Sequence, residues 1–143
     1  KTLFLNTPVV GGAGCAGCHR GEEFDINPVS GNNNVITSAS GEKDFTVTRA
    51  PSLRDIFNNN GVLNGNLMHD GSLATLESVI DHYNQITIDP ENNNLDPRLM
   101  GGPGGNGQNL ALSDNQKAAI VAFIKTLSGD NIYTDEKWSD PFD

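Results

Sequence analysis

The stretch Cys15-Ala16-Gly17-Cys18-His19 decides the fold, because it places two thiols and an imidazole within five consecutive residues. The pattern C-x-x-C-H is the attachment site of a c-type haem. Thiols one helical turn apart can add across the haem vinyl groups, and His19 then reaches the iron from the same side. Both cysteines of the chain lie in this motif, so none remains for a disulfide or another metal. The stretch therefore predicts a covalently bound haem c, held by Cys15, Cys18 and His19.

Two other chemistries also use a C-x-x-C pair. A structural zinc usually takes four Cys and His ligands in two pairs, but the chain has no second cysteine pair, and His69 and His82 stand apart in the sequence. A thioredoxin-type dithiol is expected beside a strand in a βαβ context. The preceding residues 9–14 are too short and glycine-rich for a central strand, and no repeating strand–helix pattern follows. Haem attachment is the interpretation that the sequence favours.

Length and composition indicate one loop-rich domain. The chain has 143 residues, which is enough to enclose a haem in one core, so residues 1–143 are expected to form a single cytochrome c domain. Only 36% of the residues are hydrophobic, and there are 16 glycines and 7 prolines. A large apolar cofactor would supply part of the core of such a chain. We expect an all-α, loop-rich, cytochrome c-like domain wrapped around one haem.

The charge of the chain excludes some classes of partner. A formal net charge of −9 with scattered basic residues argues against nucleic-acid binding. An acidic surface permits transient docking to a redox protein with a basic patch, and it also serves ordinary solubility. No apolar run approaches the roughly 20 residues that span a bilayer. The first residues, 1–5, lack the shape of a signal peptide, so we expect a mature or excised piece, with any targeting segment or neighbouring domain already removed.

Hydrophobic spacing predicts where regular structure lies. A short helix is expected over residues 2–5, irregular loops over residues 27–43 and 91–110, and a minor strand over residues 45–48. A helix is expected to begin at Ser72 as its N-cap, with His82 as a surface or capping residue beside an apolar stripe formed by Leu73, Leu76, Val79, Ile80 and Tyr83.

The last helix has the clearest signals. Ser113 is expected to cap it in a capping box with Gln116, and Gly129 to end it. Its predicted buried stripe is formed by Ile120, Val121, Phe123, Ile124 and Leu127. Trp138 and Phe142 are expected to fold back and hold the C-terminal tail.

The second axial ligand decides the chemistry, because a filled sixth position favours electron transfer and an open one invites small molecules. The candidates are Met68, Met100, His69 and His82. Met68 lies in a turn-rich segment just before the Ser72 helix, whereas Met100 precedes a glycine-rich stretch that would cost more to order. His69 cannot point the same way as its neighbour and is expected to bond locally, with Asp70. Met68 is therefore the expected ligand and Met100 the second candidate, with apolar filling as the alternative role of Met68.

Several motifs besides C-x-x-C-H occur, one after another, along nearly the whole chain. They are residues 49–54 (R-A-P-S-L-R), 68–77 (M-H-D-G-S-L-A-T-L-E), 81–84 (D-H-Y-N), 95–97 (L-D-P), 112–117, 120–127 and 139–142 (S-D-P-F). With them the chain resembles the C-terminal, electron-accepting domain of the bacterial di-haem cytochrome c peroxidase family.

The resemblance implies a high-potential haem with His and Met ligands. It places Met68 at the methionine position, and Pro51 and Arg54 where the family packs against the haem and its propionates. The guanidinium of an arginine can also bond both oxygens of a carboxylate. Without the resemblance, Arg54 is equally well explained as a surface arginine at the start of a helix. The chain has one C-x-x-C-H, so the peroxidatic haem, its domain and the calcium site between the domains are missing from this sequence.

The function expected from the sequence is therefore single-electron transfer through a His19- and Met68-ligated haem. An enzymatic alternative is a haem peroxidase of the di-haem type, or a fragment of one. A third possibility is a cytochrome module of a larger secreted redox protein.

Overall fold

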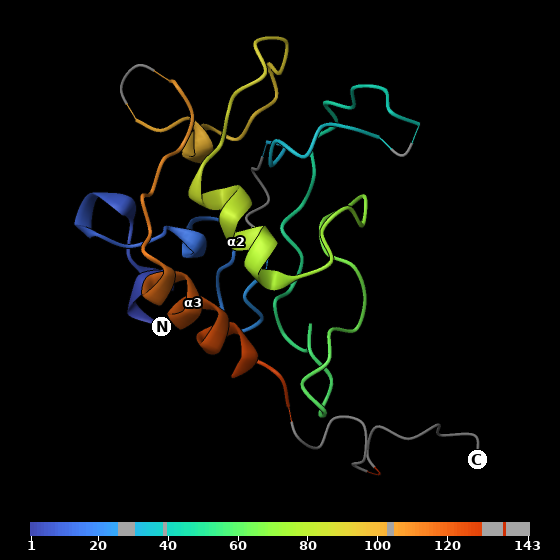
Figure 1. Cartoon of the computed structure of the whole chain (residues 1–143), viewed down its shortest axis with the longest axis vertical. Helices are drawn as coiled ribbons and strands as arrows, with labels where there is room; N and C mark the ends of the chain where they lie inside the picture. Colours follow the sequence, from blue (N-terminus) through green and yellow to red (C-terminus); the bar gives the residue numbers. More distant parts are fainter. Residues whose placement is uncertain (26–30, 39, 103–104, 130–135, 137–143) are drawn as a thin grey trace.

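Helices joined by long irregular segments make up the part of the chain that the computed structural model describes, which is residues 1–25, 31–38, 40–102, 105–129 and 136 (Figure 1). The α-helices are α1 (Thr2–Leu5), α2 (Leu76–Asn84) and α3 (Asp114–Lys125), and short 3-10 turns form η1 (Pro8–Val10), η2 (Cys15–Gly17) and η3 (Pro97–Leu99). Within these ranges extended residues form only isolated bridges and no strand. The loop-rich, helical character that was predicted is confirmed.

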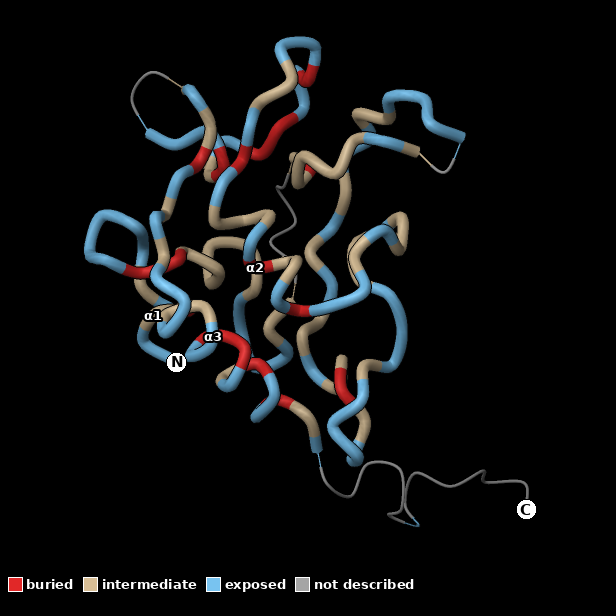
Figure 2. Tube along the Cα trace, viewed as in Figure 1, coloured by how far each residue is buried: buried red, intermediate tan, exposed pale blue. Residues whose placement is uncertain are grey.

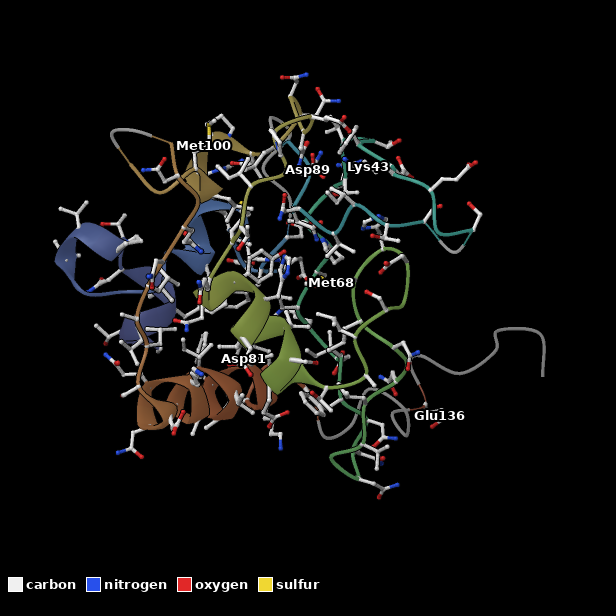
Figure 3. The ribbon with its side chains drawn as sticks, turned by 45° about the horizontal axis from the view of Figure 1, so that its top comes forward. Lys43, Met68, Asp81, Asp89, Met100 and Glu136 are labelled. Carbon is white, nitrogen blue, oxygen red and sulfur yellow. The ribbon has the colours of Figure 1, made fainter. Side chains whose placement is uncertain are left out.

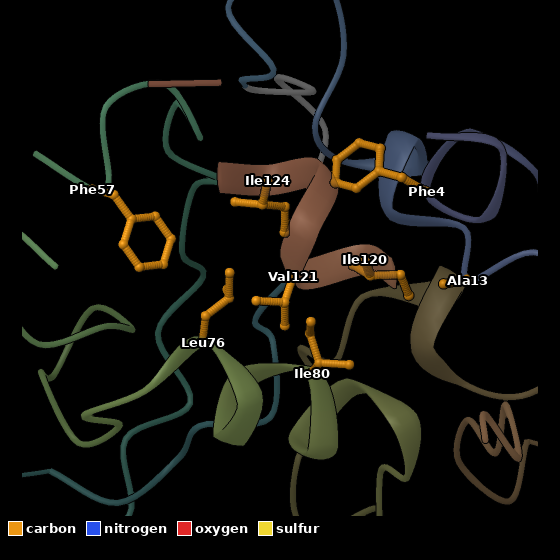
Figure 4. Packing of buried hydrophobic residues seen from close by; sticks show 8 residues of the cluster. All are labelled: Phe4, Ala13, Phe57, Leu76, Ile80, Ile120, Val121 and Ile124. Atoms are coloured by element: carbon orange, nitrogen blue, oxygen red, sulfur yellow. The ribbon is translucent and has the colours of Figure 1, made fainter. Parts of the chain in front are cut away.

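The core lies where the three α-helices meet (Figure 4). Phe4 of α1 is 1% exposed and Ile120 of α3 is 2% exposed. Phe4 and Phe123 lie with ring centroids 5.2 Å apart, and Phe24 contacts both rings. The buried members of this cluster are Phe4, Ala13, Phe57, Leu76, Ile80, Ile120, Val121 and Ile124. Buried residues occur in all three α-helices and also at points along the connecting loops, which otherwise alternate between exposed and half-buried stretches (Figure 2).

Helix α3 forms as its sequence predicts at the N-terminal end. The Ser113 hydroxyl accepts from the Gln116 N–H, and the Gln116 side chain accepts from the Ser113 N–H in return, which completes the capping box. The C-terminal end was predicted wrongly. The helix ends at Lys125, and the Gly129 N–H donates instead to Asp55 Oδ1 at 2.7 Å. Gly129 therefore ties the chain to an earlier loop rather than ending the helix.

Helix α2 begins later than predicted. Thr75, not Ser72, is the N-cap, and its hydroxyl accepts from the Ser78 N–H at 3.1 Å. The Ser72 N–H donates to Asp70 Oδ1 at 3.0 Å, so Ser72 belongs to a turn stabilised by an aspartate. Leu73 consequently lies in an extended bridge with Leu67 and not in the helical stripe. The predicted strand over residues 45–48 is also wrong, because these residues take no regular structure.

Asparagine side chains hold two of the long loops together. Asn32 and Asn92 are 1% and 7% exposed, and each amide nitrogen donates to the other's oxygen, at 2.7 Å and 2.9 Å. Asn32 and Leu95 form a parallel bridge beside them. The polar loops that the sequence predicted here are thus ordered by buried amide pairing.

Trp138 and Phe142, which were expected to hold the tail, lie outside the described residues. Among the helices that are described, none has the length and apolar character that crossing a bilayer would need.

Candidate haem-binding site

The two cysteines lie on one turn of 3-10 helix. Gly14 precedes η2 with a left-handed backbone (φ 71°), which turns the chain into this helix. The N–H groups of Cys18 and His19 both donate to the carbonyl of Cys15, at 3.2 Å and 2.9 Å. Both thiols are free and half-buried, and burial raises the pKa of Cys15 to about 11. The motif therefore presents two neutral thiols from one short rigid turn.

The ring of His19 is held in one tautomer. Its Nδ1 lies 3.0 Å from the carbonyl oxygen of Phe24 and 3.1 Å from that of Pro51. A carbonyl oxygen only accepts, so Nδ1 carries the proton and Nε2 keeps its lone pair. Burial lowers the pKa of His19, against the smaller raising effect of the two carbonyls. A neutral imidazole with Nδ1–H bonded to the backbone is the state in which Nε2 ligates a metal.

An ion pair between a buried aspartate and a half-buried arginine fixes the middle of the motif. Arg98 Nη1 donates to the carbonyl of Gly17 at 2.6 Å, while its Nε and Nη2 donate to the two oxygens of Asp96 at 2.7 Å and 2.6 Å. The Asp96 side chain is 3% exposed. This bidentate pair lies beside Cys18, whose pKa is affected by both charges. The sequence analysis did not single out Asp96 or Arg98 as site residues, although Asp96-Pro97 appeared among the family motifs.

Met68 lies near the middle of the molecule, beside α2, and Met100 at its rim (Figure 3). The backbone of Met68 is left-handed (φ 70°), which is uncommon for a residue with a side chain. Its Sδ accepts a hydrogen bond from Asn33 Nδ2 at 3.5 Å. Met100 is 40% exposed. The structure thus holds the sulfur of Met68 in a defined position and leaves Met100 largely open to solvent.

Tyr83 bonds the amide that holds the methionine. Its hydroxyl accepts from Asn33 Nδ2 at 3.3 Å. Its pKa is raised to about 12, chiefly by burial, and the charges of Cys18 and Cys15 also raise it. The phenol is therefore a neutral, buried group that bonds the same amide as Met68. Tyr83 was predicted only as part of the α2 stripe, and Asn33 only as part of a polar loop.

Pro51 and Arg54 contact the segment that follows the motif. Pro51 is exposed and offers its carbonyl to His19. Arg54 Nε donates to the Glu22 carbonyl at 2.7 Å and pairs with Glu23 at 3.4 Å, and its guanidinium lies 5.8 Å from the Phe24 ring. Contact of either side chain with a haem propionate stays a prediction.

The two remaining histidines differ. His69 is exposed, and the Asp70 carboxylate that was expected to bond it accepts from the Ser72 N–H instead. His82 is half-buried, not a surface residue, and its Nε2 donates to the Asn33 carbonyl at 2.8 Å. A cavity of about 480 Å³ borders this region, lined by residues 34–38, Asp70, Ser72, Leu73 and His82.

The donor set fits a covalently attached haem. Cys15 and Cys18 would form the thioether links, His19 Nε2 would ligate the iron, and the thioether of Met68 is a suitable opposite ligand. Within the described ranges no group of three His, Cys, Asp or Glu residues gathers to bind a metal ion by itself.

The C-x-x-C-H motif indicates a haem protein, and comparisons with known proteins support that class. No protein-family model matches the chain. It is related in sequence to the di-haem cytochrome c peroxidase and MauG family, as its motifs indicated.

Among its relatives, the methylamine utilization protein MauG of Methylorubrum extorquens is 30% identical over 84% of this chain and 32% of its own length. The cytochrome c551 peroxidase of Nitrosomonas europaea is 28% identical over 83% of this chain and 32% of its own length. A solved structure of a MauG-like protein associated with microbial copper homeostasis superposes on this chain with a TM-score of 0.65 and 26% identity. The match includes 99% of this chain and 46% of the chain in that structure. The chain therefore spans a third or less of the curated relatives that it matches, between 18% and 32%.

Proposed function

We propose that this chain is a single-haem electron-transfer domain, with haem c attached through Cys15 and Cys18 and ligated by His19 and Met68. The observation that supports this most directly is the pair of held donor atoms. The Nδ1 of His19 is bonded to two carbonyls, and the Sδ of Met68 is bonded by Asn33. When bound, haem c supplies a one-electron ferric–ferrous couple.

The residues around these donors favour electron transfer over turnover of a small molecule. Backbone carbonyls fix the His19 ring and a side-chain amide fixes Met68, so both ligands can stay in place in the two oxidation states. Small rearrangement of the ligands favours fast outer-sphere transfer. The net charge of −9 suits a redox protein partner with a basic patch, and a periplasmic or extracellular location follows from the type of haem attachment proposed.

The test begins with the wild-type chain matured with haem. Haem that stays with the denatured polypeptide on a gel supports covalent attachment, and a pigment that is extracted contradicts it. The oxidised protein should show the weak long-wavelength charge-transfer band of sulfur on ferric haem. Met68→Ala should abolish this band and Met100→Ala should leave it intact. The opposite result would move the ligand to Met100.

A haem peroxidase is the second candidate, because relatives carry the name cytochrome c peroxidase. The cavity of about 480 Å³ beside residues 70–73 would admit a small ligand to this part of the molecule. Cyanide or carbon monoxide binding by the wild-type chain, together with peroxide turnover, would support this alternative. The electron-transfer proposal expects neither.

A further inference from the structure

We infer that Asn33 is a positioning residue that orients the sulfur of Met68 and raises the reduction potential of the haem. This inference rests on the proposed function, because it takes Met68 as the axial ligand. The observation that carries it is the single amide group shared by two side chains. Asn33 Nδ2 donates to Met68 Sδ at 3.5 Å and to the Tyr83 hydroxyl at 3.3 Å.

Asn33 is itself held by three hydrogen bonds, two to its side-chain amide and one to its main chain. Its Oδ1 accepts from the Val35 N–H at 3.1 Å, its nitrogen bonds Tyr83, and its main-chain carbonyl accepts from His82 Nε2 at 2.8 Å. Tyr83 and His82 are consecutive residues of α2, with rings 5.1 Å apart. The helix thus fixes the position of Asn33, and Asn33 fixes the sulfur.

Met68 needs such a partner because its own backbone does not determine where the sulfur lies. Methionine is flexible, with three rotatable side-chain bonds, and Met68 sits in a turn with φ 70°. The thioether accepts only weak hydrogen bonds, so an amide donor at this distance selects one rotamer without competing with a metal for both lone pairs.

The same bond affects the redox equilibrium. A hydrogen bond to one sulfur lone pair withdraws electron density from the thioether. Ferric iron depends more on this density than ferrous iron does, so the bond favours the reduced state. Hydrogen bonds to a ligand are one of the ways in which a protein sets a haem potential. The electron comes from the redox partner of the proposed function and returns to it.

The test compares Asn33→Leu and Asn33→Ser in the haem-loaded chain. The serine hydroxyl can still accept from the Val35 N–H but is too short to reach the sulfur, so this variant keeps the turn if the leucine variant fails to fold. Asn93→Ser is the matched control, since Asn93 is exposed and bonds only the nearby carbonyl of Glu91 in the described contacts. The readouts are the midpoint potential and the wavelength of the sulfur charge-transfer band.

Both Asn33 variants should lower the midpoint potential. The expected shift is up to about 59 mV, which corresponds to a tenfold change in the one-electron equilibrium constant. They should also shift the sulfur band, while the control changes neither. An unchanged potential and band in Asn33→Ser would overturn the inference and leave the proposed function intact. A wild-type chain without the sulfur band would overturn both, because Met68 would then not be the ligand.

Discussion

Asp96 and Arg98 are the residues at which charge and burial act most strongly on the motif. Burial raises the pKa of Asp96, but hydrogen bonds from Arg98 and from the Gly31 N–H outweigh it and hold the pKa below the ordinary value of 3.8. A carboxyl with a lowered folded pKa stabilises the protein above its unfolded pKa, and this contribution is lost as the pH falls through the folded pKa. We therefore expect wild-type stability to fall below about pH 4.

Asp96→Asn tests this at residue scale. It removes the carboxylate charge that accepts from Arg98, so the free energy of unfolding at pH 7 should fall by about 2 kcal/mol. The further loss of stability below about pH 4 should be weaker than in the wild type. Denaturant unfolding followed by circular dichroism at several pH values measures both effects. Exposed Glu22→Gln should change the free energy of unfolding by less than about 0.5 kcal/mol.

Single residues also mark where prediction from sequence ends. Cys15, Cys18 and His19 were found because their spacing is itself the chemical requirement. Asn33 gave no signal, because its role depends on a loop meeting α2 across 50 residues of sequence. Arg98 was missed for the same reason, since its carbonyl partner, Gly17, lies 81 residues away.

Among the helices, α2 shows that a capping residue cannot be chosen from residue type alone. Ser72 and Thr75 are both acceptable N-caps. Asp70 accepts the N–H of Ser72, which draws that residue into a turn, so the helix begins only after Thr75. The beginning of α3 was predictable because Ser113 and Gln116 satisfy one another locally.

Thr75→Ala and Ser72→Ala test which of the two residues is the N-cap of α2. Loss of the Thr75 hydroxyl leaves the Ser78 N–H without its acceptor and should cost about 1 kcal/mol of stability. Ser72→Ala should cost less than Thr75→Ala, because the main-chain N–H of Ser72 still donates to Asp70 in this variant. Thermal unfolding of the two variants makes the comparison. A larger loss in Ser72→Ala would indicate that the helix begins there in solution.

For the whole molecule, stability depends on the place where α1, α2 and α3 meet. The apolar spacing of α3 predicted its buried face, and Ile120, Val121, Ile124 and Leu127 are buried as expected. The part played by Phe4 could not be predicted, because a four-residue helix has no periodicity from which to infer a buried face. Its burial depends on Phe24 and Phe123 arriving from elsewhere in the chain.

Phe4→Ala should therefore destabilise the whole fold by about 3–5 kcal/mol, by removing a ring from the centre of the core. Val9→Ala is the control from the same end of the chain, since Val9 is 94% exposed and should change the free energy of unfolding by less than about 0.5 kcal/mol. Denaturant unfolding of both variants provides the measurement. Equal stability of the two would show that α1 does not belong to the cooperative core.

The reciprocal amides of Asn32 and Asn92 restrict how this molecule can change over time. Each side-chain amide donates one hydrogen bond to its counterpart and accepts one from it, and both nitrogens also donate elsewhere, Asn32 to the Phe45 carbonyl and Asn92 to Asn34 Oδ1. Aspartate at either position would bring two oxygens face to face, and leucine would remove one hydrogen-bond partner from the opposite buried amide. A replacement at either position therefore removes hydrogen bonds from both loops, which lie 60 residues apart, so the two loops are constrained to change together.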